Sequence, residues 1–256
     1  MTELQFGSRV NDFAMRAFRN SADKDYIAAR LSVRSGLIPQ FLWSSLQAFE
    51  KYFKYILLVN RIPSGHLSHN IEKSLELIRD QVPYVSDLRP DELGIFNQIA
   101  NQGGDRYLID SYSVHGHLLP ELDAAIWDVR RYCQVILPQD GCSSEEQRIY
   151  ELTCEHIGKT RSSPRKFRIQ GGILEKIVAD RYHAAHAGLC WQNGYFGQHS
   201  RSQVRAHFYL DAENAPLLHY PDMIDYLAKL IFIPGGSKKG YQQYLEAIRS
   251  GNAARF

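Results

Sequence analysis

Pairs of arginine and histidine are the residues of this 256-residue chain whose types could do chemistry on a phosphate. An arginine offsets the charge of the phosphate, and an imidazole can move a proton near neutral pH. Three pairs have four or five residues between their members: Arg61 and His66, Arg181 and His186, and Arg201 and His207. With 20 arginines and 10 histidines, chance alone gives about two such pairs, so the spacing by itself predicts nothing.

The surroundings of the three pairs separate them. The first pair lies in a predicted loop, and the third flanks the start of a possible strand. Arg181 and His186 lie within a predicted helix, where residues five apart point to different faces. The sequence therefore leaves Arg181 and His186 as a minor candidate for a catalytic pair.

No arrangement of histidines or cysteines predicts a metal site. Close histidines could share a metal only if carboxylates joined them, and no His-Glu-x-x-His pattern is present. The close pairs are His66 with His69, His115 with His117, and His183 with His186. The four cysteines have no Cys-x-x-Cys spacing, so we expect reduced cytosolic thiols and neither a metal nor a cofactor.

The stretch from Gly158 to Arg168 is strongly basic. It holds five cations and no acid, and such a loop can engage a phosphate backbone. The five cations are Lys159, Arg161, Arg165, Lys166 and Arg168. Aromatic residues further on, at 191, 195 and 196, could stack on unpaired bases. The alternative is a solvated loop beside buried aromatic residues. With a net charge of only +2, any nucleic-acid contact must come from such a local patch.

A long amphipathic helix from Pro39 to Asn60 is the element on which the others are expected to pack. Its apolar residues recur at spacings of three and four, which is one face of an α-helix. The face consists of Leu42, Leu46, Phe49, Phe53 and Ile56. Further helices are predicted from Ser21 to about Arg34, from His69 to Val82 and over 118–137, after a loosely ordered lead-in over residues 1–20. Arg30 and Arg34, four residues apart, are expected to be solvated or to face an acid elsewhere.

A stretch rich in proline, glycine and serine, Leu137 to Ser144, divides the chain. We expect residues 1–137 to form an antiparallel helical bundle and residues 138–256 to form a mostly helical C-terminal region with at most one or two short strands. In this second region, helices are predicted over about 144–157, 173–192, 221–231 and 237–249, and a strand over 203–210. The fold class is therefore all-α.

Nothing in the sequence predicts a membrane segment. The N-terminus has no apolar core of signal-peptide length, and no apolar run approaches about 18 residues. Hydrophobic content of 44% and charged content of 23% are typical of a soluble globular protein. We therefore expect a cytoplasmic protein with no membrane partner.

The long helix also carries a resemblance. The segment Gln47-Ala48-Phe49-Glu50-Lys51-Tyr52-Phe53-Lys54 resembles the signature helix of HEPN domains, in which Gln-Ala, a hydrophobic residue, Glu-Lys, an aromatic residue, a hydrophobic residue and Lys follow one another. His69-Asn70-Ile71 is similar to the opening of the family's next helix, and Arg106-Tyr107 resembles an Arg-Tyr pair that precedes the last helix in part of the family. The resemblance covers about residues 20–137.

This resemblance implies a HEPN-like bundle associated with RNA or nucleotides, often as a homodimer and often in a prokaryotic defence or toxin system. Many members are ribonucleases with an Arg-x4–6-His motif near the start of the last helix. At that place this chain has Arg106 and His115 with eight residues between them, so the spacing departs from the motif. Arg106 and His115 are the catalytic candidates that the resemblance indicates.

Two alternatives to RNA association follow from this departure. One is a non-catalytic helical module that binds another protein. The other is a metal-independent ribonuclease whose arginine and histidine come together from distant positions. Converging arginine and histidine side chains in a groove would favour the enzyme, whereas a closed apolar groove without them would favour the module.

Overall fold

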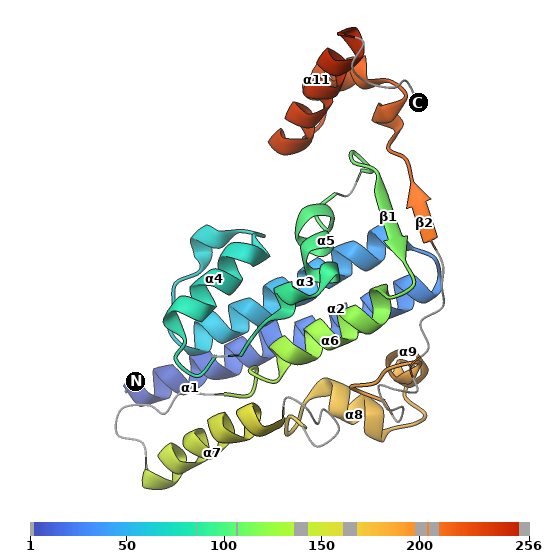
Figure 1. The fold of residues 1–256 in the computed structure, drawn as a ribbon. Helices are drawn as coiled ribbons and strands as arrows, with labels where there is room; N and C mark the ends of the chain where they lie inside the picture. The colour runs from blue at the N-terminus through green and yellow to red at the C-terminus, as the bar shows by residue number, and fades with distance from the viewer. Residues whose placement is uncertain are drawn as a thin grey trace. The chain divides into compact units, whose positions relative to one another are not determined.

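The computed structural model describes residues 3–85, 87–105, 107–135, 143–160, 168–197, 204 and 210–250. The chain forms two compact units, one made of Met1–Gly104 and His117–His207 and the other of Asp105–Gly116 and Phe208–Phe256. Most of the described residues are helical, and their strands form one two-stranded sheet (Figure 1), which confirms the predicted all-α class. The predicted boundary between residues 137 and 138 lies outside the described residues.

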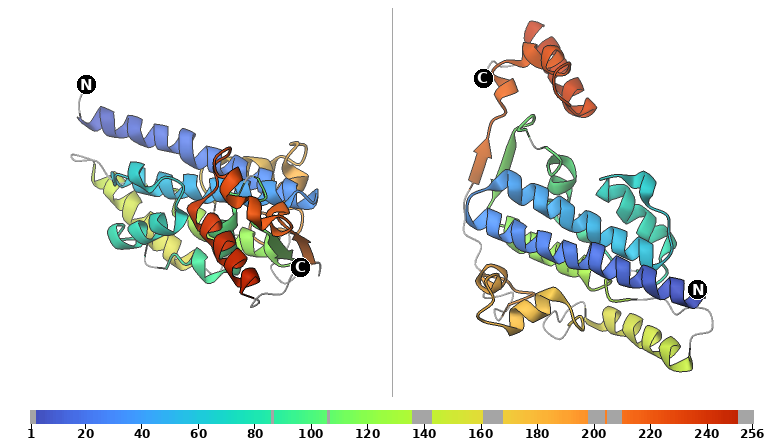
Figure 2. Two further views of the ribbon diagram at one scale, coloured as in Figure 1. Left: turned by 90° about the horizontal axis from the view of Figure 1, so that it is seen from above. Right: turned by 180° about the vertical axis from the view of Figure 1, so that it is seen from behind.

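The first unit is built around a pair of long helices that pack along each other, α2 and α3 (Figures 1 and 2). Helices α4, α5 and α6 also contact α3, so α3 is covered on several sides. The elements are α1 (Glu3–Phe13), the π-helical η1 (Ala14–Arg19), α2 (Asn20–Arg34), α3 (Ile38–Val59), α4 (Ile71–Gln81), α5 (Gly94–Gln102) and α6 (Leu118–Arg130). The helix from Glu3 corrects the prediction of a loosely ordered lead-in, because residues 3–34 run through α1, η1 and α2 without an intervening loop.

Helix α3 is the buried centre of this unit, as its periodicity predicts. Phe49 and Phe53 have no exposed surface, and Leu46 is 3% exposed. The Phe49 ring meets the Phe96 ring of α5 edge to face, with 5.3 Å between centroids. At Gly103, a Cβ atom would lie 2.9 Å from the Leu46 Cβ, so only glycine allows this approach of the α5 end to α3.

Three further helices belong to the first unit: α7 (Ser144–Thr160), α8 (Ile173–Ala179) and α9 (His186–Cys190). Ser143 caps α7, since its hydroxyl accepts from the Glu146 N–H while its own N–H donates to the Glu146 carboxylate. The predicted continuous helix over 173–192 is wrong. The side chain of Asp180 accepts from the Tyr182 N–H and its carbonyl accepts from the His183 N–H, so turns replace the helix between α8 and α9.

The second unit contains the sheet and a small core. Strand β1 (Tyr112–His115) pairs antiparallel with β2 (Leu210–Glu213), with Val114 opposite Asp211. The strand expected over 203–210 starts only at its last residue; position 204 is not in a strand, and 203 and 205–209 lie outside the described residues. Short turns η6 (Pro216–Leu218) and η7 (Pro221–Met223) lead to α10 (Ile224–Leu227), and α11 (Gly235–Arg249) follows. The predicted helix over 221–231 is thus shorter than expected. The core consists of Ile109, Leu217, Ile224, Ile233 and Tyr241.

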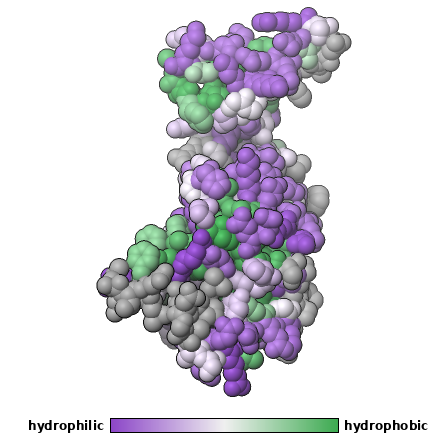
Figure 3. Space-filling view, turned by 90° about the vertical axis from the view of Figure 1, so that its left-hand side faces the viewer, coloured by the Kyte–Doolittle hydropathy of each residue, from purple (hydrophilic) through white to green (hydrophobic). Residues whose placement is uncertain are grey.

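Hydrophilic side chains predominate on the face drawn in Figure 3, and hydrophobic side chains form smaller areas among them. No helix in the described part of the chain is long and apolar enough to cross a membrane.

The substitution Phe49→Ala should lower the free energy of unfolding by about 3–5 kcal/mol, because it leaves a cavity beneath α5 that the surrounding helices cannot fill. Urea unfolding of both proteins measures the difference. Exposed Phe6→Ala on α1 serves as the control and should change stability little. A loss below about 1 kcal/mol for Phe49→Ala would show that α3 is peripheral.

Candidate nucleic-acid interface

Four of the six cations in the predicted catalytic and nucleic-acid-binding sets lie outside the described residues, namely Arg106, Arg161, Arg165 and Lys166. The pair Arg201 and His207 lies outside them too. His115 is exposed at the end of β1, opposite Leu210, so its geometry relative to Arg106 stays a prediction. Lys159 and Arg168 are exposed on either side of residues 161–167, and Lys159 pairs with Glu155 on the surface of α7.

Four of the polar residues that carry the HEPN resemblance, Gln47, Glu50, Lys54 and His69, come together around the Glu50 carboxylate. Glu50, which is almost fully buried, accepts hydrogen bonds from Gln47 and Lys54 on α3 and lies 2.7 Å from Nδ1 of His69. Asn70 follows His69 and caps α4 by accepting from the Lys73 N–H. The contact between Glu50 and His69 therefore holds the start of α4 against α3. The same carboxylate also accepts a hydrogen bond from Lys54.

The segment around α9 is fastened to the bundle by Arg30, a buried residue of α2. Its guanidinium pairs with Asp123 of α6 and donates to two backbone carbonyls, those of Gly188 and Trp191. These carbonyls belong to the C-terminal end of α9, where a cation is favourable. Tyr26 also donates to Asp123 at 2.6 Å, and Asn193 donates to the Tyr26 hydroxyl at 2.9 Å. The network fixes the backbone of residues 188–193 against α2 and α6.

A second buried arginine, Arg130 of α6, fastens α8. It pairs with Asp23 of α2 at 2.7 Å and, through two nitrogens, with Glu175 of α8 at 2.7 and 2.8 Å. Burial lowers the pKa of Arg130, but Asp23 and Glu175 outweigh that effect, so the guanidinium stays charged. Arg30 and Arg130 together hold α8 and α9 on the same side of the bundle, where Figure 1 shows them below α6.

The turns before α9 present a row of exposed polar and aromatic side chains. Tyr182 is 89% exposed, and the Arg181 guanidinium lies 5.6 Å from the centre of its ring. His183 accepts from the Ala185 N–H through Nδ1, so its neutral ring carries the proton on Nε2. His186, the first residue of α9, is half-buried, and its Nε2 lies 3.6 Å from Sγ of Cys190.

An aromatic residue and a further cation follow on the other side of α9. Trp191 remains 38% exposed, and the Arg34 guanidinium lies 4.9 Å from the centre of its indole. Arg34 also donates to the Ala187 carbonyl, so the stack is held against α9. Burial raises the pKa of the Cys190 thiol, although Arg30 acts in the opposite direction, so this cysteine is protonated near neutral pH. We call Arg34, Arg181, Tyr182, His183, His186 and Trp191 together the α9 rim.

The structure places Arg181 and His186 in a different local backbone from the one predicted. The two residues do not share a helix, contrary to the prediction: Arg181 lies in a turn, and His186 is the first residue of α9. Asp180 is the signal that could have shown this, because its side chain favours a turn. Arg34 stacks on Trp191 although the two residues are 157 positions apart, so this contact could not be predicted from sequence spacing.

Comparison with protein-family models, with curated proteins and with solved structures finds no match. The HEPN resemblance thus rests on the sequence motifs alone. Within the described ranges, no group of three or more His, Cys, Asp or Glu side chains is placed to hold a metal ion.

The contribution of Glu50 to stability should depend on pH. Burial raises the pKa of this carboxyl, but the hydrogen bonds from Lys54 and His69 more than offset it, so the folded pKa lies below the ordinary value. A lowered folded pKa stabilises the protein above the unfolded pKa of about 4.3, and the contribution is lost as pH falls through the folded value. Glu50→Gln should therefore destabilise by about 1–2 kcal/mol at pH 7 and by much less near pH 3. Urea unfolding across this range measures it, with exposed Glu76→Gln as the control. If the loss of stability in Glu50→Gln were the same at pH 7 and pH 3, the charge of the Glu50 carboxylate would not contribute to stability.

Proposed function

We propose that this chain is a HEPN-like helical protein that binds RNA, and that the α9 rim is part of its RNA-binding surface. The observation that supports this most is the composition of the rim. Two guanidiniums, two exposed aromatic rings and two imidazoles gather around one short helix. Guanidiniums pair with phosphates, and aromatic rings stack on unpaired bases.

The buried arginines support the same proposal, because a binding surface gains affinity when its backbone is fixed before the ligand arrives. Arg30 and Asn193 hold the α9 backbone, and Arg130 holds α8 before it. Aromatic rings stack on any base, so we expect the protein to bind unpaired RNA with little preference for its sequence. The basic loop over 158–168 stays a predicted second contact.

A second candidate function is metal-independent RNA cleavage. Arg181 and His186 have the four-residue spacing of the Arg-x4–6-His motif, and they lie near the start of a helix, as that motif does. In such a reaction the histidine takes the proton of the 2′-hydroxyl while the arginine offsets charge on the phosphate. By the same resemblance, the protein would act in a prokaryotic defence or toxin system, as a homodimer.

We expect Tyr182→Ala to weaken binding of single-stranded RNA about 5- to 100-fold, because each base stacked on a ring contributes about 1–3 kcal/mol. Arg181→Gln should weaken it and lower the dependence of log K on log salt by about one, since one phosphate contact is lost. Fluorescence anisotropy with a labelled oligonucleotide measures both. Exposed Tyr226→Ala and Arg148→Gln are the matched controls and should leave affinity unchanged.

The same assay tests the rival sites. Binding that survives every α9 rim substitution, yet is lost when Arg161, Arg165, Lys166 and Arg168 are neutralised, would move the RNA site to the basic loop. For cleavage, the intact protein is incubated with RNA and a chelator. Activity that is lost on His186→Ala supports the second candidate, whereas activity lost only on Arg106→Ala or His115→Ala places the site in the other unit.

A further inference from the structure

The two ring nitrogens of His186, at the start of α9, have different surroundings. Nε2 lies 3.6 Å from Sγ of Cys190, one turn further along the helix. Nδ1 has no hydrogen-bond partner in the described part of the chain and is not among the fully buried atoms that lack one. Because the residue is half-buried rather than enclosed, Nδ1 is the nitrogen that a ligand can reach.

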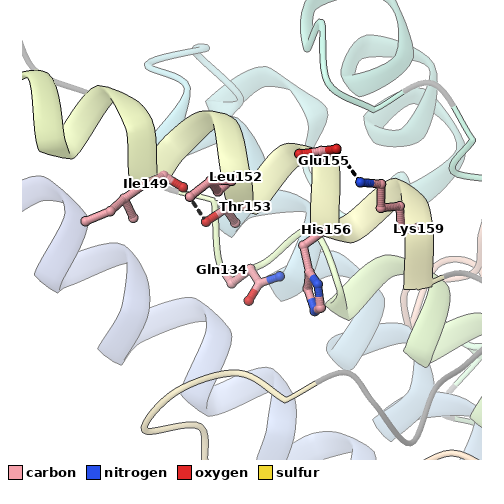
Figure 4. Close-up of a pocket in the computed structure, with 7 residues that line it drawn as sticks. All are labelled: Gln134, Ile149, Leu152, Thr153, Glu155, His156 and Lys159. Carbon is pink, nitrogen blue, oxygen red and sulfur yellow. Dashed lines mark hydrogen bonds and ion pairs between the residues drawn. The ribbon is translucent and has the colours of Figure 1, made fainter.

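Two donors at the groove beside α7 are not presented to a ligand in this way (Figure 4). The Thr153 hydroxyl donates to the Ile149 carbonyl within the helix, and the Nε2 of Gln134 is fully buried. Neither side chain can offer its hydrogen to a ligand without a rearrangement, whereas His186 already faces solvent in part.

The thiol is the donor in the contact between Cys190 and His186. Burial raises the pKa of Cys190, with Arg30 acting in the opposite direction, so the sulfur keeps its hydrogen near neutral pH. Two acceptors compete for this one hydrogen, the imidazole nitrogen at 3.6 Å and the Phe196 carbonyl at 3.8 Å. The nitrogen is the nearer of the two. The reverse bond, from a ring N–H to sulfur, would use a weak acceptor, so donation from the thiol to Nε2 is favoured.

This bond determines where the neutral imidazole carries its proton, because the bond made by one ring nitrogen sets the state of the other. With Nε2 accepting from the thiol, His186 has its proton on Nδ1. His183 has the opposite tautomer, since its Nδ1 accepts from the Ala185 N–H. Both imidazoles of the α9 rim therefore offer an N–H donor while they are neutral. A general base needs a free lone pair, and that of His186 is engaged by the thiol.

We propose that Cys190 is a positioning residue for His186: its thiol holds the Nε2 lone pair, so that the imidazole offers an Nδ1–H to a phosphate oxygen of RNA and is not free to act as a base. This inference rests on the proposed function, and it favours binding of RNA over its cleavage. Arg30 keeps the two side chains in register, because it donates to the carbonyl of Gly188 between them.

The tautomer of His186 can be measured on the full chain without RNA. Long-range proton–nitrogen correlation NMR at about pH 8, where a free imidazole is neutral, distinguishes a protonated ring nitrogen from a bare one. The signals of His186 are identified by their loss in His186→Asn. We expect Nδ1 to be protonated and Nε2 to be bare in the wild type. Cys190→Ala should remove this preference, and Cys154→Ala, which removes another partly buried thiol, should leave it unchanged.

The role of the Nδ1–H in binding is tested by two substitutions at His186. In His186→Asn the side-chain amide places an N–H close to the position of Nδ1, so this variant should retain most of the RNA affinity. His186→Leu should weaken binding about tenfold or more, as expected when a hydrogen bond to a charged group is lost. Fluorescence anisotropy with a labelled single-stranded oligonucleotide measures both variants.

A wild-type His186 with its proton on Nε2 would overturn the proposal, as would an Nδ1–H tautomer that Cys190→Ala leaves unchanged. Equal RNA affinity of His186→Leu and the wild type would overturn the donor role and leave the proposed function in place, because Tyr182 and Arg181 test that function separately. RNA binding that is insensitive to Tyr182→Ala and Arg181→Gln would remove the proposed function, whatever the tautomer of His186.

Discussion

Charges buried in the core must be paired, and this constraint determines how the second half of the first unit is attached. Arg30, Arg130 and Arg131 are almost fully enclosed, and each faces at least one carboxylate. Removing one partner of such a pair typically costs about 3–5 kcal/mol, because the other charge is left without compensation. Two of these pairs join α2 to α6 and so fix the relative positions of the two helices: Arg30 with Asp123, and Arg130 with Asp23. Because Arg130 reaches Glu175 and Arg30 reaches the carbonyls of α9, these two arginines fix α8 and α9 as well.

The attachment explains why a short helix can carry a binding surface. A five-residue helix has almost no stability of its own, since nucleating a helix costs more than one turn returns. Two kinds of contact supply the missing stability. The Arg30 guanidinium donates to a carbonyl at the C-terminal end of α9. Gly188 packs closely against α2, since a Cβ there would lie 2.6 Å from the Leu31 side chain. The turns before it can then present side chains outward, as they do with Tyr182.

Apolar periodicity was enough to predict α3, its central position and the all-α class, because a stripe of large apolar residues can be buried only by other helices. Periodicity failed at 173–192, where the polar side chain of Asp180 bonds the backbone and ends α8. It could not identify the partner of Arg30 either. A solvated arginine and one facing an acid have the same spacing on α2, and the acid lies 93 residues away. The site is correspondingly less predictable than the fold: Arg181 and His186 were visible as a pair, but their turn and their support by α2 depend on contacts across the whole unit.

Native-state hydrogen exchange on Arg30→Met tests most directly whether this arginine holds α9 in place. The Leu189 and Trp191 amides donate to the carbonyls of Ala185 and Ala187, at the start of α9, so their exchange reports its opening. We predict that their protection falls about 100-fold or more, while amides of α3 such as that of Phe53 lose much less, because about 3 kcal/mol of local stability is removed. Arg148→Met, which removes an exposed cation from α7, should change them little. Protection of Leu189 and Trp191 that is unchanged in Arg30→Met, or that falls only as far as that of Phe53, would contradict the account.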